Sequence, residues 1–345
     1  MTANRTRGET SGAAPSARVR HPYLVVRARF PVTPERYRKI AFFALGSLTA
    51  IVLTGAAVRL TDSGLGCPDW PRCYGRAVPP LSFHSVVEYG NRVFSALVGF
   101  VALGTWIASF LRTPRRRDLT WISALLPLGC ACQGVLGAFT VKHELAPGFV
   151  MGHFGLSMLI LVAAVALAWR ASHEPDEQRP PQDRLTVWVV RLAALVGAVV
   201  LFAGTVATAS GPHAGGEGDQ LIHRFHFKGA STLTWVIHRH AVLATTLGLL
   251  VILAWFMARR RGGSVQLVET LTVVGVLMAA QGLVGSVQYE LQLPADIVWV
   301  HVGLATINWI ALLWAVAVAG RIRPAQPPSP PADVAARDLE PAGLR

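Results

Sequence analysis

Charged side chains are scarce in this chain, and acidic ones are scarcer than basic ones. Charged residues make up only 15% of the 345 residues, whereas hydrophobic residues make up 52%. So little charge argues against an ordinary water-soluble domain. It is typical of a protein whose folded surface lies largely in a lipid bilayer.

Two further absences narrow the class of protein. The 32 lysines and arginines outnumber the 19 aspartates and glutamates, for a net charge of +13, but the chain lacks a basic segment interleaved with aromatic residues. The arginines lie in tails and short loops, which argues against a nucleic-acid partner and favours a topology signal. The first 35 residues also lack an apolar core, so we expect no cleaved signal peptide there.

Long apolar runs, in contrast, are abundant. Each is long enough to cross about 30 Å of hydrocarbon at about 1.5 Å per residue. We therefore predict an all-α integral membrane protein with eight transmembrane helices. The runs occupy residues 39–61, 86–111, 119–141, 149–170, 185–209, 234–258, 266–289 and 296–319.

Basic residues mark one side of this predicted array. They gather at 112–117, 170–184 and 259–261, and at Arg321 and Arg323, in segments on the same side as the N-terminal tail. The opposite loops hold few lysines or arginines. Because basic loops stay in the cytoplasm, we expect a multi-pass protein of the plasma membrane with both termini cytoplasmic.

A polar linker at residues 171–184 divides the chain into two halves, 39–170 and 185–319. Residues 1–38 are rich in arginine, serine and glycine, and residues 320–345 are rich in proline. Both end segments are predicted to be disordered cytoplasmic tails.

The two halves share one stretch of sequence. Residues 133–156 and 281–304 align without a gap, and each copy ends one apolar run and opens the next with a histidine, His153 or His301. A tandem duplication explains this pattern, so the predicted fold is two pseudo-repeated four-helix bundles. The coinciding pairs are Gln133/Gln281, Gly134/Gly282, Gly137/Gly285, Leu145/Leu293, Val150/Val298, His153/His301, Gly155/Gly303 and Leu156/Leu304.

The histidine of the second copy has a candidate partner. His238 and His301 lie at similar depth on two predicted helices, and two neutral imidazoles on facing helices are the usual means by which a bundle holds a haem. The alternative is that each histidine only hydrogen-bonds in a packed interior. His240 is a rival to His238, because two residues turn a helix by about 200° and only one can face the axis.

The first half differs at one position, where Asn91 stands in place of His238. A haem held by His153 would then have one strong ligand and a more open opposite face, which suits chemistry rather than electron transfer. Glu88 lies three residues before Asn91 on the same helical face, and it is a candidate proton relay or stabiliser of a cationic intermediate. The alternative for Glu88 is an ion pair with Arg92 or Arg59.

Arg59, Arg92 and Arg239 lie near the outer ends of the predicted helices. Haem carries two propionates, and a guanidinium binds a carboxylate through two hydrogen bonds, so these arginines are candidate propionate ligands. The alternative for each is snorkelling toward lipid headgroups. Arg92 and Arg239 directly follow Asn91 and His238, and this equivalence favours the propionate role.

Cys67 and Cys73 lie close together in the loop after the first predicted helix. Their short separation on the oxidising side of the membrane predicts a disulfide. A metal pair is disfavoured because no cysteine or histidine at zinc spacing surrounds them. The spacing leaves open whether the bond is a structural staple or a redox-active pair.

Together these motifs resemble those of heme A synthases over about residues 39–319. The resemblance rests on the loop SGLGCPDWPRC at 63–73, on EYGNR at 88–92, on HR at 238–239, and on His153 and His301. It implies an enzyme that oxidises a ring methyl of haem O to a formyl group, giving the haem A that cytochrome c oxidase needs. The chain departs from the family pattern at Asn91, where a histidine often stands.

The resemblance also implies roles and partners. It implies a b-type haem held by His238 and His301, a substrate haem near Glu88 and His153, and functional importance for the two outer cysteines. Haem O synthase, a protohaem farnesyltransferase, and cytochrome oxidase assembly factors become candidate partners, and a homo-oligomer is a further candidate. The competing hypotheses are a membrane b-type cytochrome without porphyrin chemistry and a solute or haem transporter.

Overall fold

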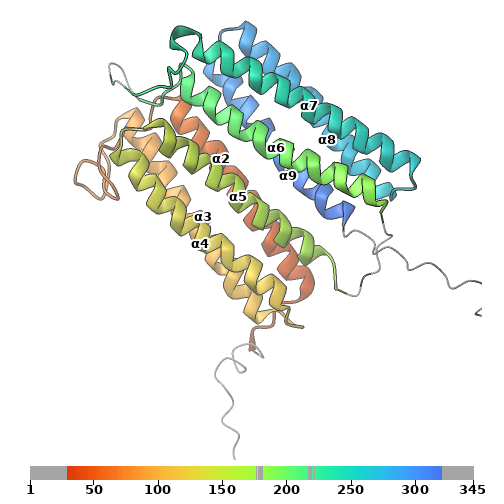
Figure 1. Ribbon diagram of the computed structural model, residues 1–345. Coiled ribbons are helices and arrows are strands. Elements are labelled where there is room, and N and C mark those ends of the chain that lie inside the picture. Colours follow the sequence, from red (N-terminus) through yellow and green to blue (C-terminus); the bar gives the residue numbers. More distant parts are fainter. Residues whose placement is uncertain (1–28, 176, 178–181, 217–219, 221, 321–345) are drawn as a thin grey trace, which may run out of the picture.

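Eight long α-helices form the described part of the chain, which is residues 29–175, 177, 182–216, 220 and 222–320 of a computed structural model (Figure 1). No strand occurs in these residues beyond two isolated bridges. Most of the predicted tails (1–28 and 321–345) and part of the linker lie outside them, whereas residues 34–38 of the predicted N-terminal tail already belong to the first long helix. The helices are α2 (Pro34–Leu60), α3 (Phe83–Leu111), α4 (Arg117–Lys142), α5 (Pro147–Ser172), α6 (Arg184–Ser210), α7 (Thr232–Arg260), α8 (Val265–Glu290) and α9 (Ala295–Ala319), and a short 3-10 turn, η1 (Gly229–Ser231), precedes α7.

Several helices begin before the apolar runs that predicted them. The hydroxyl of Thr33 accepts a hydrogen bond from the Arg36 N–H, and the hydroxyl of Ser82 accepts one from the Ser85 N–H. Such caps satisfy backbone donors that would otherwise be unpaired, so a polar first turn becomes helical. The predicted starts at 39 and 86 were therefore too late by about one turn.

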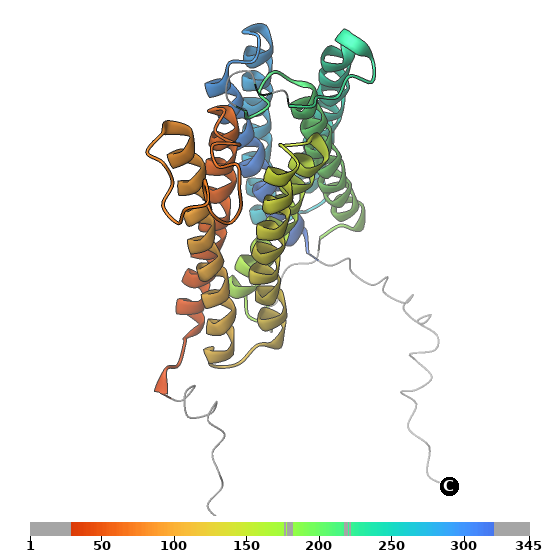
Figure 2. The same ribbon diagram turned by 90° about the vertical axis from the view of Figure 1, so that its left-hand side faces the viewer.

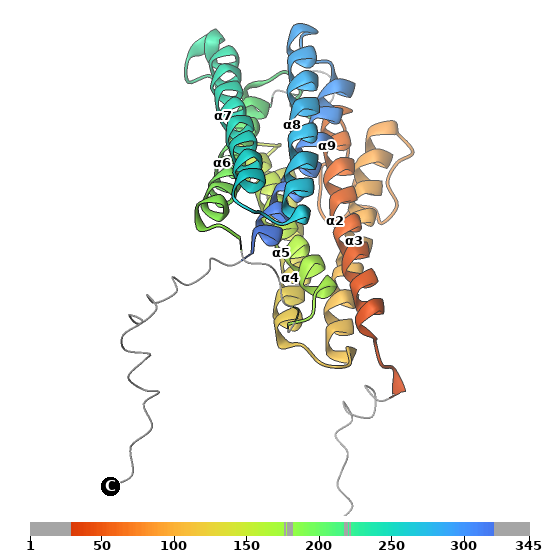
Figure 3. The ribbon, with the colours of Figure 1, turned by 90° about the vertical axis from the view of Figure 1, so that its right-hand side faces the viewer.

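The helices pack as two sets of four. Within α2–α5 each helix contacts its neighbours in sequence, and α5 closes the ring against α2; α6–α9 pack in the same order. Figure 2 shows α2–α5 in front, and Figure 3 shows α9 between α8 and α2. The indole N–H of Trp309 donates to the carbonyl of Met158 (3.1 Å), and that of Trp299 to the carbonyl of Leu53 (2.9 Å). Tryptophans of α9 thus join the two sets.

Many large apolar side chains point outward. Phe100 is 70% exposed and Trp121 is 76% exposed, and both belong to helices long and apolar enough to cross a membrane. In a bilayer such side chains face lipid, and the backbone of each helix satisfies its own hydrogen bonds. The prediction of an all-α, eight-helix membrane protein is confirmed.

The connections lie at two opposite ends of the array. We call one end the disulfide face, where Cys67, Cys73, Lys142, His213 and Gln292 lie. We call the other end the arginine face, where Arg112, Arg116, Arg170, Arg184 and Arg260 lie. Every candidate site residue named from the sequence lies toward the disulfide face.

Candidate functional site

A disulfide joins Cys67 and Cys73 in the loop between α2 and α3, so the predicted bond is confirmed. Both cysteines are fully buried. The loop packs tightly on the start of α3, where the Ser85 hydroxyl donates to the Gly66 carbonyl (2.7 Å). A side chain at Gly66 would meet the His84 carbonyl at 2.3 Å, so only glycine permits this approach.

Glu88 and Arg92 of α3 hold the same loop through hydrogen bonds to its backbone. One Glu88 carboxylate oxygen accepts the Cys67 N–H (2.7 Å), and the other accepts the Arg92 guanidinium. Arg92 also donates to the carbonyls of Asp69 (2.8 Å), Arg72 (3.0 Å) and Cys67 (3.2 Å). Of the interpretations open for Glu88, the geometry shows the ion pair. Its role as a proton relay, and that of Arg92 as a propionate ligand, stay predictions.

The Asp69 carboxylate holds the exposed tip of the loop. It accepts hydrogen bonds from the backbone N–H groups of Gly75 (2.7 Å) and Tyr74 (2.6 Å). These donors, Gly75 foremost, lower the pKa of Asp69 below its ordinary value. A lowered folded-state pKa means that the stabilisation is present above the unfolded pKa, about 3.9, and is lost as pH falls through the folded value.

Replacing Asp69 by asparagine is therefore expected to loosen the loop tip at pH 7. The amides of Tyr74 and Gly75 should exchange hydrogen several-fold faster than in the unsubstituted protein, because a charged acceptor is replaced by a neutral one. Exchange measured by mass spectrometry checks this, with Asp62→Asn as a control in the same loop. Equal protection in Asp69→Asn and the unsubstituted protein at pH 7 would contradict the prediction.

His153 and His301 occupy matching places on α5 and α9. The His153 ring lies over Gly137 of α4, 3.5 Å from where a β-carbon would stand, and the His301 ring lies over Gly285 of α8, at 3.1 Å. Each histidine therefore packs into a gap that a helical glycine leaves on the preceding helix.

His240, rather than His238, faces His301. The ring centroids of His240 and His301 are 6.4 Å apart, and the His240 ring lies over Gly204 of α6 at 3.2 Å. His238 is exposed and lies 6.5 Å from the Tyr289 ring. His240 follows the buried Val236 by four residues and shares its helical face, whereas His238 lies almost opposite. The geometry therefore places His240, the rival of His238, beside His301, and which of the two binds haem stays a prediction.

The remaining candidates contact other parts of the chain. The Asn91 side-chain oxygen accepts a hydrogen bond from the Thr54 hydroxyl of α2 (2.8 Å). Arg59 donates to the His213 carbonyl (2.8 Å) and so ties α2 to the loop between α6 and α7. The Arg239 guanidinium lies over the Trp235 ring, 5.2 Å from its centroid. The structure thus brings His240 to His301 and Glu88 to Arg92, but it does not bring these two pairs together.

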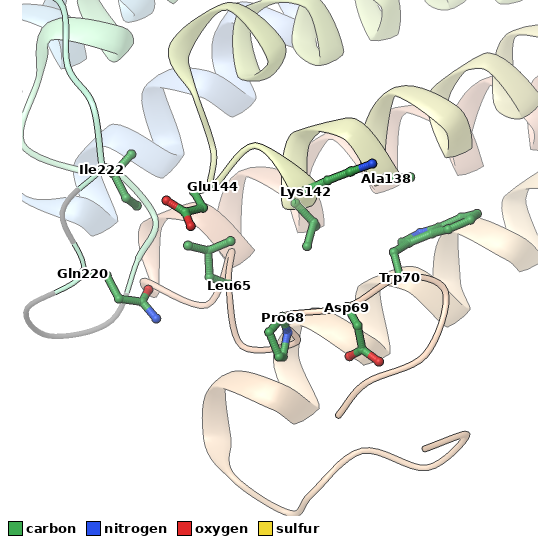
Figure 4. Close-up of a pocket in the computed structure, with 10 residues that line it drawn as sticks. Leu65, Pro68, Asp69, Trp70, Ala138, Lys142, Glu144, Gln220 and Ile222 are labelled. Carbon is green, nitrogen blue, oxygen red and sulfur yellow. The ribbon is translucent and has the colours of Figure 1, made fainter. Parts of the chain in front are cut away.

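A cavity of about 530 Å³ opens beside the disulfide loop (Figure 4). Leu65 and Trp70 line it from the loop, Lys142 and Glu144 from the end of α4 and the turn that follows, and Ile222 from the second half. Its size lies within the range of small-molecule pockets. The lining mixes apolar surface with charges of both signs.

Sequence reasoning gave no role to several residues at this site. Gln133 and Gln281 donate side-chain hydrogen bonds to the carbonyls of His153 (2.9 Å) and His301 (3.2 Å). A signal was present, because both glutamines coincide in the repeated stretch. Gly204 carried no such signal, since its contact with His240 depends on how two helices pack.

Comparison with known proteins supplies the family. A family model described as COX15-CtaA, cytochrome oxidase assembly protein, matches residues 38–217, which is more than half of the chain. A protein named heme A synthase from Symbiobacterium thermophilum is 31% identical over 281 residues, covering 75% of this chain and 87% of that protein. The chain belongs to the heme A synthase family.

Other relatives match over shorter stretches. The heme A synthase of Alkalihalophilus pseudofirmus is 28% identical over 61% of this chain and 73% of its own length. That of an Exiguobacterium species is 30% identical over 38% of this chain, and that of Shewanella oneidensis is 29% identical over 44%. The chain spans 45% and 51% of the lengths of these last two relatives, which is about half.

Membership of the heme A synthase family implies that the chain binds haem, and the described residues fit that group. The Nδ1 atoms of His153, His240 and His301 are buried without a hydrogen-bond partner. The 6.4 Å between the His240 and His301 centroids would let both imidazoles reach one metal ion with bonds of about 2 Å. His240 and His301 would therefore hold a haem iron between them, and His153 would offer one ligand in the other half.

Proposed function

We propose that this chain is a heme A synthase that oxidises a ring methyl of haem O to a formyl group, giving haem A for cytochrome c oxidase. The observation that carries the proposal is the His240–His301 pair, set inside the second group of helices in a member of this family. Converting a methyl to a formyl group removes electrons from its carbon and adds an oxygen atom, so turnover requires an electron acceptor and a source of oxygen such as water.

The two halves take different tasks in this proposal. The second half holds a resident b-type haem through His240 and His301, because a closed pair of histidines suits electron transfer. The first half receives haem O at His153, and Asn91 leaves the opposite side open. Glu88 lies on the Asn91 helix as a candidate for moving protons, and Arg59, Arg92 and Arg239 remain candidates for the propionates.

The pattern of burial indicates that Asn91 of α3 is equivalent to His240 of α7 in the repeat. Val98 and Ala102 of α3 are buried, and Leu247 and Val251 of α7, each the same number of residues further along the chain, are buried as well. The same shift in residue number relates Asn91 to His240 rather than to His238. The substrate half would then lack one of the two imidazoles that the resident half provides.

The orientation follows from charge and redox chemistry. We infer that the arginine face is cytoplasmic, because basic loops are retained there. The disulfide face then lies outside the plasma membrane, where a Cys67–Cys73 bond persists. Haem O synthase would supply the substrate, and cytochrome oxidase assembly factors would receive the product.

The test is to express the protein in a host that supplies haem O, extract its porphyrins and separate them by mass. Haem A together with retained haem B is the expected result. If only haem B is found while haem O is present, the chain acts as a b-type cytochrome and the synthase proposal fails. An unchanged haem O pool with no bound haem would overturn both.

A further inference from the structure

Three histidines each lie over a glycine of a neighbouring helix. They are His153 on α5, His240 on α7 and His301 on α9. For His240 the glycine is Gly204 of α6, where a β-carbon would stand 3.2 Å from the ring. Each ring therefore fills a gap that a helix leaves at a residue without a side chain. The repeat predicts a fourth gap of this kind on α2.

The fourth gap lies at Gly55, and no side chain fills it. The shift in residue number that relates Asn91 to His240 also relates Gly55 to Gly204. Gly55 follows the buried Val52 by one turn, so it faces the inside of the first set of helices. Among the described residues, no atom lies within 4 Å of the place where a β-carbon at Gly55 would stand.

The side chain of Asn91 is held beside this gap rather than in it. The Thr54 hydroxyl donates to the Asn91 side-chain oxygen at 2.8 Å, and it lies further, at 3.3 Å, from the Ile51 carbonyl of its own helix. A helical threonine ordinarily donates to a carbonyl three or four residues back, as Thr49 does to Leu45 (2.8 Å). The shorter contact of Thr54 is the one to Asn91.

The second half has no counterpart of this hydrogen bond. The same shift in residue number relates Thr54 to Ala203, which has no hydroxyl. The two halves therefore differ at two positions beside equivalent gaps, with Asn91 in place of His240 and Thr54 in place of Ala203. Where the second half has a ring in the gap, the first half has an amide tied to α2.

We propose that Thr54 is a positioning residue that holds Asn91 away from the gap over Gly55, so that a haem bound by His153 keeps one side open to a small ligand. The inference rests on the proposed function, in which the first half binds haem O. An amide oxygen that turned into the gap would compete with a small ligand for that side of the haem. The hydrogen bond from Thr54 engages this oxygen and keeps the side chain against α2.

Carbon monoxide is the probe that tests this inference. The full-length protein, purified in detergent with haem B and haem O, is reduced with dithionite under argon, and CO binding is measured by optical difference spectra. A haem held by two histidines offers CO no free position, so CO reports on the first half. Thr54→Val replaces the hydroxyl with a methyl group and should lower the CO affinity roughly two- to tenfold, the range by which one neutral hydrogen bond shifts an equilibrium.

A second substitution shows whether Thr54 acts through Asn91. Asn91→Ala should bind CO at least as tightly as the unsubstituted protein, and adding Thr54→Val to it should change nothing, because the coupling between two residues disappears when either partner is missing. Thr49→Val is the matched control. It removes a hydroxyl of the same helix that donates to the Leu45 carbonyl, and it should leave the CO affinity unchanged.

Asn91→His should lose CO binding, because its ring would fill the gap over Gly55; CO binding retained in this variant would overturn the placement of residue 91 opposite His153. An unchanged CO affinity in Thr54→Val, or a fall that persists in the Asn91→Ala background, overturns the inference alone when His153→Ala abolishes CO binding. A protein that binds haem O but no CO has no open side, and the inference then falls together with that part of the proposed function.

Discussion

Replacing His301 or His240 with alanine is expected to lower the haem B content of the purified protein by more than about tenfold. Loss of an outer-shell partner already costs about 10–100-fold in metal affinity, and these side chains are proposed to be the ligands themselves. The centroids of the two rings lie 6.4 Å apart, so each substitution removes one ligand of the same proposed site. Pyridine haemochrome absorbance per mole of protein measures the effect.

His238→Ala is the control that this structure makes possible. His238 is a histidine on the same helix, two residues from His240, and it lies near Tyr289 rather than near His301. We expect this variant to retain haem B and its optical spectrum. Loss of haem from His238→Ala with retention in His240→Ala would reverse the assignment and restore the pairing expected from the HR motif.

The difference between these two histidines marks a limit of sequence reasoning. Eight helices were predictable because the bilayer imposes a minimum length of apolar chain, and such runs are visible directly. The direction in which a helix faces is harder to predict, because lipid is as apolar as a protein core and both sides of α7 carry apolar residues. His238 and His240 lie on opposite sides of that helix, and only the packing against Gly204 and His301 separates them.

For the disulfide loop, the covalent bond was predictable from the sequence, but the packing of the loop was not. Its bond was predictable because Cys67 and Cys73 are close in sequence and lie on the side poor in basic residues. The Glu88–Arg92 ion pair was foreseen only as one of several alternatives, and the attachment of the loop to these two residues was not foreseen. The carbonyls that Arg92 binds belong to a loop without regular structure, and no periodic pattern predicts where such a loop folds back.

Removing the Glu88 carboxylate is expected to produce the largest loss of stability among these variants. The side chains of Glu88 and Arg92 are only 7% and 16% exposed, and Glu88→Ala leaves the Arg92 charge and the Cys67 N–H without this acceptor. Breaking a buried ion pair by removing one partner costs about 3–5 kcal/mol, and the slight exposure of Arg92 places the expected loss near the lower value. Denaturant unfolding in detergent measures it.

The exposed pair Glu35–Lys39 provides the matched control. Its atoms approach to 2.9 Å with the same spacing of four residues, but the side chains are 65% and 71% exposed. Exposed pairs of this kind contribute little because solvent screens their charges, so Glu35→Ala should leave the unfolding midpoint almost unchanged. Equal unfolding midpoints for Glu88→Ala and Glu35→Ala would show that the buried pair does not stabilise the loop.

Glu88→Gln separates the structural role of this side chain from its predicted chemistry. The amide oxygen still accepts the Cys67 N–H, so we expect the variant to keep the disulfide loop and haem B with a smaller loss of stability than Glu88→Ala. A folded Glu88→Gln protein that produces no haem A would mean that the carboxylate also moves protons during the reaction. A folded variant that produces haem A at the unsubstituted rate would confine Glu88 to holding the loop, and the proton donor or acceptor would then have to be a different group.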